Sequence, residues 1–299
     1  MLSPATPLPD VAFDRASLAR ALDWVGMDGI ALPLQVDGMR LPAVADIAVD
    51  LADASKRGIH MSRLYLLLQP LASSDLSPQA LHALLRACID SQAGASTRAR
   101  LALRYRQLLL RPALASDNSG WKAYPVTLEA LLDEAGFSLQ LSLEVVYSST
   151  CPASAALSRQ RNAEAFAATF ADAVVDRDVV RDWLAGPTGM AATPHAQRSV
   201  AQVTVRLADA LPSLPVSGLV DALEAALATP VQTAVKREDE VAFAELNAAN
   251  LMFCEDAARR VAAALSVRND IAQFRARVAH LESLHAHDAV ATVSGTGVG

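Results

Sequence analysis

The stretch that decides the fold is FSLQLSLEVVY, residues 137–147. Apolar and polar residues alternate along it. One face holds Phe137, Leu139, Leu141, Leu143 and Val145, and the other holds Ser138, Gln140, Ser142 and Glu144. A period of two is the pattern of a β-strand that buries one face. The sequence therefore predicts a strand here, with one face turned towards an apolar core.

Other segments around this strand carry weaker but similar signals. Strands are predicted at residues 30–51 (two pieces around the turn Asp37-Gly38), 101–110, 200–207 and 271–281. Helices are predicted from Ser77 through Cys88, where Pro78 occupies the first helical position, and at 155–173, 176–184, 215–227 and 253–265. Residues 236–240 are predicted to be a charged loop.

These elements run through strands, a helix and strands, and then through a second mixed round. The pattern His-x-x-Arg follows a loop in each half, as His60/Arg63 and His195/Arg198. We therefore predict an α+β fold of two modules that meet near residue 150. The expected division is an N-terminal arm (1–25), a first module (26–148), a second module with most site residues (149–292) and a flexible tail (293–299).

The composition limits the class of protein. Hydrophobic residues make up 52% of the 299 residues, which is enough for a sizeable core. The net charge of −6 argues against a broad nucleic-acid surface, and no apolar run approaches the roughly 20 residues of a membrane helix. The Pro-rich, acidic start is unlike a signal peptide, and only three cysteines occur. A reduced, cytoplasmic protein is expected.

Three residue types stand where they can hold a metal ion. Cys151 follows the strongest strand directly, His195 lies in a loop before a strand, and Glu240 ends the charged segment. A thiolate, an imidazole and a carboxylate suit a catalytic divalent ion with one position open to water. For each residue alone, a structural or solvated role is equally open, because the three lie far apart in sequence.

A further stretch near the C-terminus, residues 282–287, holds Glu282, His285 and His287. If it continues the preceding strand, both imidazoles point to the same side, where they can share a substrate, a proton or a metal. Solvated histidines at a strand end are the alternative. Glu255, at the start of a predicted helix, either complements the positive helix end or grips a ligand with two adjacent donors, such as a guanine edge.

Six motifs occur in one order along residues 45–290. They are KRGIHMSR (56–63), STCPAS (149–154), HAQRS (195–199), KREDE (236–240), FCED (253–256) and ESLHAHDA (282–289). In this order they resemble the type IB GTP cyclohydrolase family, a branch of the tunnelling-fold enzymes. The resemblance implies two tandem tunnelling-fold modules, each an antiparallel sheet with helices on one face.

The resemblance also implies a reaction. The protein would open the imidazole ring of GTP with water, giving formate and 7,8-dihydroneopterin triphosphate, the first step of tetrahydrofolate biosynthesis. One divalent metal ion (Zn, Mn or Fe) per site would be held by Cys151, His195 and Glu240. Glu282, His285 and His287 would surround the reacting ring, and Glu255 would anchor the purine. Arg198, His60 and Arg63 are candidates for binding the substrate, and a homotetramer with sites at subunit interfaces is expected, without nucleic-acid or membrane partners.

The chain departs from the family pattern at two positions and in one segment. Ala153 replaces the usual second cysteine, Ala196 replaces the usual asparagine, and an apparent insertion covers residues 161–190. The alternative function is therefore a non-catalytic or altered-specificity purine- or pterin-binding paralogue with the same fold.

Overall fold

The predicted strand at residues 137–147 is the middle of a longer strand, β5 (Gly136–Thr150), in a computed structural model that describes residues 11–12, 14–171, 174–209 and 211–298. Within these residues, eight strands form a single antiparallel sheet in which each strand pairs with its neighbours in sequence. The other strands are β1 (Leu22–Val36), β2 (Met39–Leu51), β3 (Ala99–Pro112), β4 (Ser119–Asp133), β6 (Ala196–Leu207), β7 (Ile271–His280) and β8 (Ala289–Thr296).

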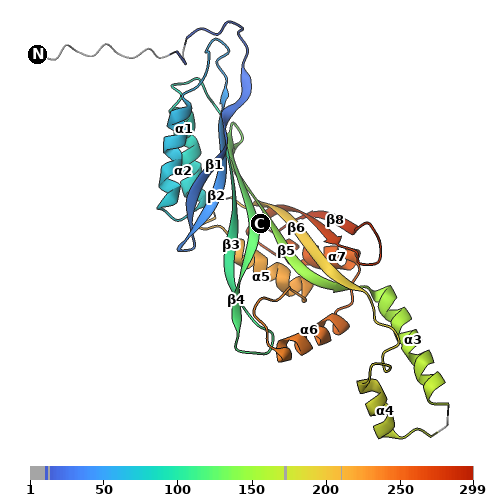
Figure 1. Cartoon of the computed structure of the whole chain (residues 1–299). Coiled ribbons are helices and arrows are strands. Elements are labelled where there is room, and N and C mark those ends of the chain that lie inside the picture. The colour runs from blue at the N-terminus through green and yellow to red at the C-terminus, as the bar shows by residue number, and fades with distance from the viewer. Residues whose placement is uncertain (1–10, 13, 172–173, 210, 299) are drawn as a thin grey trace, which may run out of the picture.

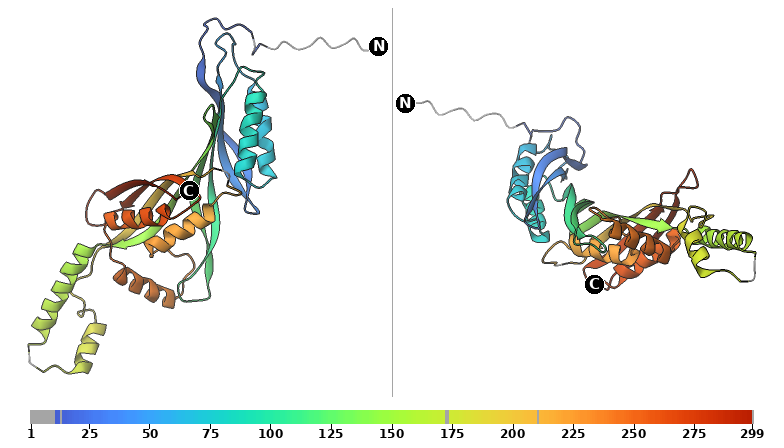
Figure 2. Two further views of the ribbon diagram at one scale, coloured as in Figure 1. Left: turned by 180° about the vertical axis from the view of Figure 1, so that it is seen from behind. Right: turned by 60° about the horizontal axis from the view of Figure 1, so that its bottom comes forward.

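Helices connect the strands, and all of them except α3 and α4 lie along one face of the sheet. They are α1 (Met61–Leu68), α2 (Pro78–Asp90), α3 (Pro152–Thr169), α4 (Arg177–Ala185), α5 (Val216–Leu227), α6 (Arg237–Ala249) and α7 (Cys254–Ser266), with a short 3-10 turn, η1 (Gln69–Ala72). Helix α2 packs on β3 and β4, α5 on β5, and α7 on β7 and β8. Figures 1 and 2 show α1 and α2 on the β1–β4 half and α5 to α7 on the other half. The expected α+β class, with helices on one face of an antiparallel sheet, is confirmed.

The core lies between the helices and one face of the sheet. The alternating residues Leu139, Leu141, Leu143 and Val145 of β5 are all buried, as the period-two pattern predicts. Val203 and Val205 of β6 continue the same layer. The layer joins both halves of the sheet into one core.

The element order repeats along the chain. Two strands, two helices and two strands occur in 22–133, and the same order with added helices occurs in 136–296. The turn between the two runs has Gly136 at φ 111°, and Asp133 Oδ1 accepts a hydrogen bond from the backbone N–H of Ala135 at 2.9 Å. The division into two modules stays a prediction, and the repeated order favours a boundary at this turn, before β5, rather than after residue 148.

Several expectations at the level of single elements are wrong. Residues 237–249 form helix α6, so the expected charged loop is the start of a helix. Residues 293–296 pair with β7 as part of β8, so the expected tail does not begin at 293. Residues 22–25 already belong to β1 rather than to the expected N-terminal arm (1–25). Residues 1–10 and 13 of that N-terminal arm lie outside the described part of the chain.

The expected insertion at 161–190 lies in an arm built from α3 and α4. The arm extends away from the sheet in each view (Figures 1 and 2). Helix α4 has no buried residue, and the rings of Phe166, Phe170 and Trp183 contact one another with centroids 5.1–6.1 Å apart. The arm is therefore held mainly by its own side chains.

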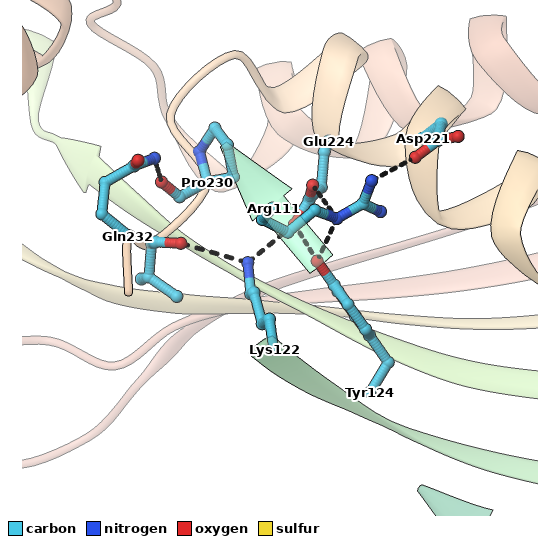
Figure 3. A network of polar contacts seen from close by, with 8 residues as sticks. Arg111, Lys122, Tyr124, Asp221, Glu224, Pro230 and Gln232 are labelled. Carbon is cyan, nitrogen blue, oxygen red and sulfur yellow. Dashed lines mark hydrogen bonds and ion pairs between the residues drawn. The ribbon is translucent and has the colours of Figure 1, made fainter. Parts of the chain in front are cut away.

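A polar network holds α5 against the β3–β4 pair (Figure 3). Glu224 of α5 accepts hydrogen bonds from Lys122 Nζ and from the Tyr124 hydroxyl, both at 2.7 Å. Arg111 donates to Tyr124 and pairs with Asp221 at 2.6 Å. The Lys122 and Glu224 side chains are only 10% and 12% exposed, so removal of either one would leave the other as an uncompensated buried charge.

Candidate functional site

Cys151 and His195 lie directly opposite each other where β5 ends and β6 begins. The register pairs Thr150 with Ala196, and the backbone N–H of Cys151 donates to the His195 carbonyl at 3.3 Å. Opposite residues of an antiparallel pair project to the same face, with Cβ atoms about 5 Å apart. The His195 N–H also donates to Ser154 Oγ at 3.1 Å. The thiol and the imidazole are thus within reach of one small ligand, as the resemblance implies.

Glu282 is the acidic side chain that approaches the His195 ring. Its Oε2 lies 3.6 Å from His195 Nε2, and its side chain is only 12% exposed. Oε2 is buried and has no hydrogen-bond partner. The approach follows from the sheet, because β7 pairs with β6 and the Leu281 N–H donates to the Arg198 carbonyl at 3.1 Å.

A thiol, an imidazole and an orphaned carboxylate oxygen make a donor set that suits a divalent ion. The three residue types suit a metal ion and lie at the same end of the sheet, but their side chains do not yet form a coordination site. Among the residues that the structure describes, no three His, Cys, Asp or Glu side chains are already close enough to hold an ion. The residues that would hold an ion here are Cys151, His195 and Glu282.

Glu255 lies beside the same end of the sheet. Leu251 forms a parallel bridge with Thr150, and the Met252 N–H donates to the Thr150 carbonyl at 3.2 Å, which brings the start of α7 next to Cys151. The backbone N–H of Glu255 itself and the Cys254 thiol, whose Sγ is 3.3 Å from Oε2, hold the pKa of the Glu255 carboxyl below its usual value. Burial, above all, raises the pKa of Cys254 to about 11, so the thiol stays protonated and donates. Glu255 is therefore an exposed, ionised carboxylate, as an anchor for a base requires.

A buried polar layer lies beneath these residues, and the sequence analysis missed it. Its members, all under 10% exposed, are Tyr147, Ser149, Gln197, Ser199 and His280. They occupy core-facing positions at the ends of β5, β6 and β7, where alternation would place apolar residues. Three polar residues on the core face of adjoining strand ends, Ser149, Gln197 and Ser199, were the signal available in the sequence.

Glu240 does not join Cys151 and His195 within this chain. It lies exposed in the first turn of α6, whereas the contact of α6 with the site end of β5 is made by Asn247, whose Oδ1 accepts from Ser148 Oγ. At 1.5 Å per residue, Glu240 is about 10 Å from Asn247 along the helix. Its neighbour Asp239 is fully buried and accepts hydrogen bonds from Ala115, Ser116 and Lys236.

His285 and His287 lie in an exposed loop after β7. The strand does not continue through them, because β7 ends at His280, one residue before the predicted end, so the condition for two imidazoles on one side of a strand is not met. The two rings nevertheless stack, with centroids 5.2 Å apart and planes 12° from parallel. Both rings are exposed to solvent and lie in the same loop that begins at Glu282.

Three of the predicted substrate-binding residues lie elsewhere in the chain. Arg198 is exposed and alternates with the core-facing Gln197 and Ser199, so its side chain is on the uncovered face of the sheet. His60 is the N-cap residue of α1, and its backbone N–H donates to Gln92 Oε1 at 2.8 Å; Arg63, in α1, donates to the Ser91 carbonyl. Helix α1 and the Cys151 end of β5 lie at opposite ends of the molecule (Figures 1 and 2).

The protein's relatives were found by comparison of sequence and of fold. A family model described as type I GTP cyclohydrolase folE2 matches residues 8–291. The chain is 50% identical over 285 residues to the GTP cyclohydrolase FolE2 of Pseudomonas putida, covering 95% of each protein. It is 49% identical over 284 residues to that of Chromohalobacter salexigens, covering 95% of this chain and 93% of the other. A hyper-thermostable AgUricase mutant has the same fold, with a TM-score of 0.50, 9% identity and 92% of both chains covered.

Proposed function

This chain belongs to the type I GTP cyclohydrolase FolE2 family, and from that premise we propose that it opens the imidazole ring of GTP, releasing formate and 7,8-dihydroneopterin triphosphate. GTP cyclohydrolase activity in folate biosynthesis is supported by about 50% identity over 95% of the chain. The narrower assignment to type IB and a cytoplasmic location are part of the proposal. No helix in the described residues has the length and apolar character to cross a membrane.

The observation that carries the proposal is the meeting of Cys151, His195 and Glu282 at one end of the sheet. The family is metal-dependent, and these three side chains are the ones we expect to hold a divalent ion, whether Zn, Mn or Fe. A divalent ion held there would supply a Lewis acid that lowers the pKa of water to about 7. Glu240, the carboxylate that the resemblance implies, remains a candidate ligand, but it needs a shift of α6 or a second copy of the chain.

The neighbouring residues then divide the remaining work. Glu255 accepts the two adjacent N–H donors of the guanine edge, because its ionised carboxylate lies beside the metal-binding end. His285 and His287 move protons on and off the ring nitrogens as the ring opens and formate leaves. Glu282, which the resemblance also implies to be at the reacting ring, is assigned here to the ion because it lies beside His195. The stacked histidines lie one loop from Glu282, so closure of that loop over the substrate would bring them to the reacting atoms.

A homotetramer with shared sites is supported by the residues that lie apart. His60 and Arg63 belong to the start of α1, a helix that lies far from the α3 end of β5 (Figure 1), and Arg198 is on the uncovered face of the sheet. If they bind the triphosphate, they do so for a site completed by another copy. Guanidinium groups suit phosphate oxygens, and a protein with a net charge of −6 must gather positive charge locally.

The test is turnover of GTP by purified protein loaded with zinc, manganese or iron. Formate and dihydroneopterin triphosphate, the latter detected as a fluorescent oxidised pterin, are the expected products. Protein that holds stoichiometric metal but releases neither product with any of the three ions would contradict the proposal. Protein that binds GTP without holding metal would instead favour the non-catalytic paralogue.

A further inference from the structure

A continuous chain of hydrogen bonds runs beneath the candidate site, from β6 to the end of β7. Gln197 Nε2 donates to Ser149 Oγ at 2.9 Å, and Ser149 and Ser199 hydroxyls are 2.7 Å apart. Ser199 also hydrogen-bonds the Tyr147 hydroxyl. The Tyr147 hydroxyl in turn lies 2.9 Å from His280 Nε2, with the two rings edge to face. Five side chains from three strands thus form one path.

Each link of this path joins a donor to an acceptor. The Gln197 amide nitrogen can only donate, so Ser149 Oγ accepts from it. Either hydroxyl can be the donor between Ser149 and Ser199. The hydroxyls of Ser149, Ser199 and Tyr147 can each donate one hydrogen bond and accept others, which is what a continuous path requires.

The path is also fully enclosed. Ser199 and Tyr147 are 0% exposed, and none of the five side chains exceeds 8%. In a layer without contact to solvent, a hydroxyl that lacks a hydrogen-bond partner lowers the stability of the fold by more than a hydrogen bond at the surface raises it. Apolar side chains would fill the same positions at lower cost, so stability alone does not explain five polar residues there.

The two ends of the path adjoin the two sides of the candidate metal site. Gln197 is two residues after His195 on β6, and His280 is two residues before Glu282 at the end of β7. The backbone hydrogen bonds of Cys151 to His195 and of Leu281 to Arg198 extend the ladder past the strand ends. Two residues along an extended chain return a side chain to the same face, so His195 and Glu282 are expected on the face that carries the path. Locking Gln197 and His280 in place fixes the strand ends that carry His195 and Glu282.

We propose that the chain Gln197–Ser149–Ser199–Tyr147–His280 is a positioning element that sets the distance between the His195 imidazole and the Glu282 carboxylate. None of its members touches the substrate. This inference rests on the proposed function, since it assigns a purpose to residues under that same site. It adds Tyr147 and His280 to the residues on which metal affinity and turnover depend.

The test removes one hydroxyl from the middle of the path. Tyr147→Phe leaves the ring in place and deletes the hydrogen bonds to His280 and Ser199. We expect zinc affinity, measured by equilibrium dialysis, and kcat for GTP each to fall about 10- to 100-fold, with KM changed less than about 3-fold. His280→Gln keeps an acceptor for the Tyr147 hydroxyl and is expected to keep zinc affinity within about 5-fold of wild type, whereas His280→Leu behaves like Tyr147→Phe.

The matched control is Tyr124→Phe. It also deletes a buried tyrosine hydroxyl with two partners, Glu224 and Arg111, but from the network under α5. We expect it to lower the melting temperature while zinc affinity and kcat stay near wild type. Ser149→Ala, which interrupts the path at a smaller residue, serves if Tyr147→Phe does not fold.

The outcomes separate this inference from the proposed function. A wild-type protein that binds zinc but does not act on GTP contradicts the proposed function, and the zinc affinities of the variants still test the path. Unchanged zinc affinity in both Tyr147→Phe and Ser149→Ala overturns the positioning role. Equal loss of zinc affinity in Tyr124→Phe overturns it too, because the effect would then be one of general stability.

Discussion

The Nε2 atom of His195 and the Oε2 atom of Glu282 lie 3.6 Å apart, although the two residues precede β6 and follow β7. Both positions follow from the pairing of β6 with β7, which places the start of one strand beside the end of the other. The carboxylate oxygen is buried without a hydrogen-bond donor. A metal ion between the two groups would satisfy both.

Replacement of Cys151 by alanine should abolish metal binding and turnover. Cys151 is the only thiol that lies opposite His195, and a lost ligand cannot be replaced by a methyl group. Metal content by mass spectrometry and GTP turnover measure the two effects. Cys88→Ala is the control, since Cys88 lies on the buried face of α2 and its loss should affect stability alone. Full metal content in Cys151→Ala would move the ligand role to another residue.

The two acidic candidates for the metal site can be told apart by amide substitution. Glu282→Gln should lower metal affinity strongly, because Glu282 is the carboxylate beside His195. Glu240→Gln should leave metal affinity unchanged if one chain holds the ion, since Glu240 is exposed at the far end of α6. Isothermal titration with zinc measures both. The reverse result would mean that a second copy, or a displaced α6, supplies the ligand.

Asp239 should make the stability of the protein depend on pH in the acid range. Hydrogen bonds from the Lys236 N–H, the Ser116 hydroxyl and further backbone N–H groups hold the pKa of its carboxyl far below the usual value. A carboxyl with a lowered pKa in the folded state adds stability above its unfolded pKa of about 3.9, and this is lost as the pH falls through its folded value. The urea concentration at half-unfolding should therefore be higher for wild type than for Asp239→Asn at pH 7. The difference between the two midpoints should become smaller below about pH 4.

The control for Asp239 is Asp117→Asn in the loop that faces it. Asp117 pairs with Lys236 at 2.7 Å but is 89% exposed, so its removal should change the urea midpoint little at any pH. A difference in urea midpoint between wild type and Asp239→Asn that stays constant down to about pH 2 would contradict the lowered pKa. The effect of the substitution would then come from side-chain packing and not from the charge of the carboxyl.

Glu224→Ala should destabilise the fold by about 3–5 kcal/mol, because it leaves the Lys122 ammonium buried without its carboxylate. Asp221→Ala removes the neighbouring but 58% exposed partner of Arg111, and should cost less than about 1 kcal/mol. Chemical unfolding at pH 7 compares the two variants. Similar losses in both would show that the network in Figure 3 is solvated rather than buried.

The sequence predicted the fold best where alternation is uninterrupted. Strand β5 was evident from Leu139 to Val145, whose apolar residues are all buried. Strand β4 was not assigned, because Gly120 and Pro125 are signals of a loop, although Tyr124, Val126 and Leu128 alternate into the core.

Helix α6 was predicted as a loop because its first residues, 237–240, are all charged. Acidic residues suit the positive first turn of a helix, and the Asp239 carboxylate accepts from the N-cap N–H of Lys236. The charge run was therefore a helix start. Periodicity alone cannot distinguish the two when the apolar face is narrow.

The candidate site could be predicted only in part. The residue patterns pointed to Cys151, His195, Glu282 and Glu255 as candidates, and the resemblance gave each of them a role. The contact between His195 and Glu282 depends on strand pairing over a long separation, which no local pattern encodes. The separation of Glu240, Arg198, His60 and Arg63 from that contact likewise depends on the three-dimensional arrangement.

The arm of α3 and α4 leaves the sheet after Cys151 and returns before His195, while the strand ladder and the first turn of α3 hold those two residues opposite each other. The length of the excursion is consequently uncoupled from the geometry at its base. A second domain inserted in place of α4 should therefore leave the arrangement of Cys151 and His195 unchanged, which makes this position suitable for fusing another protein to the enzyme.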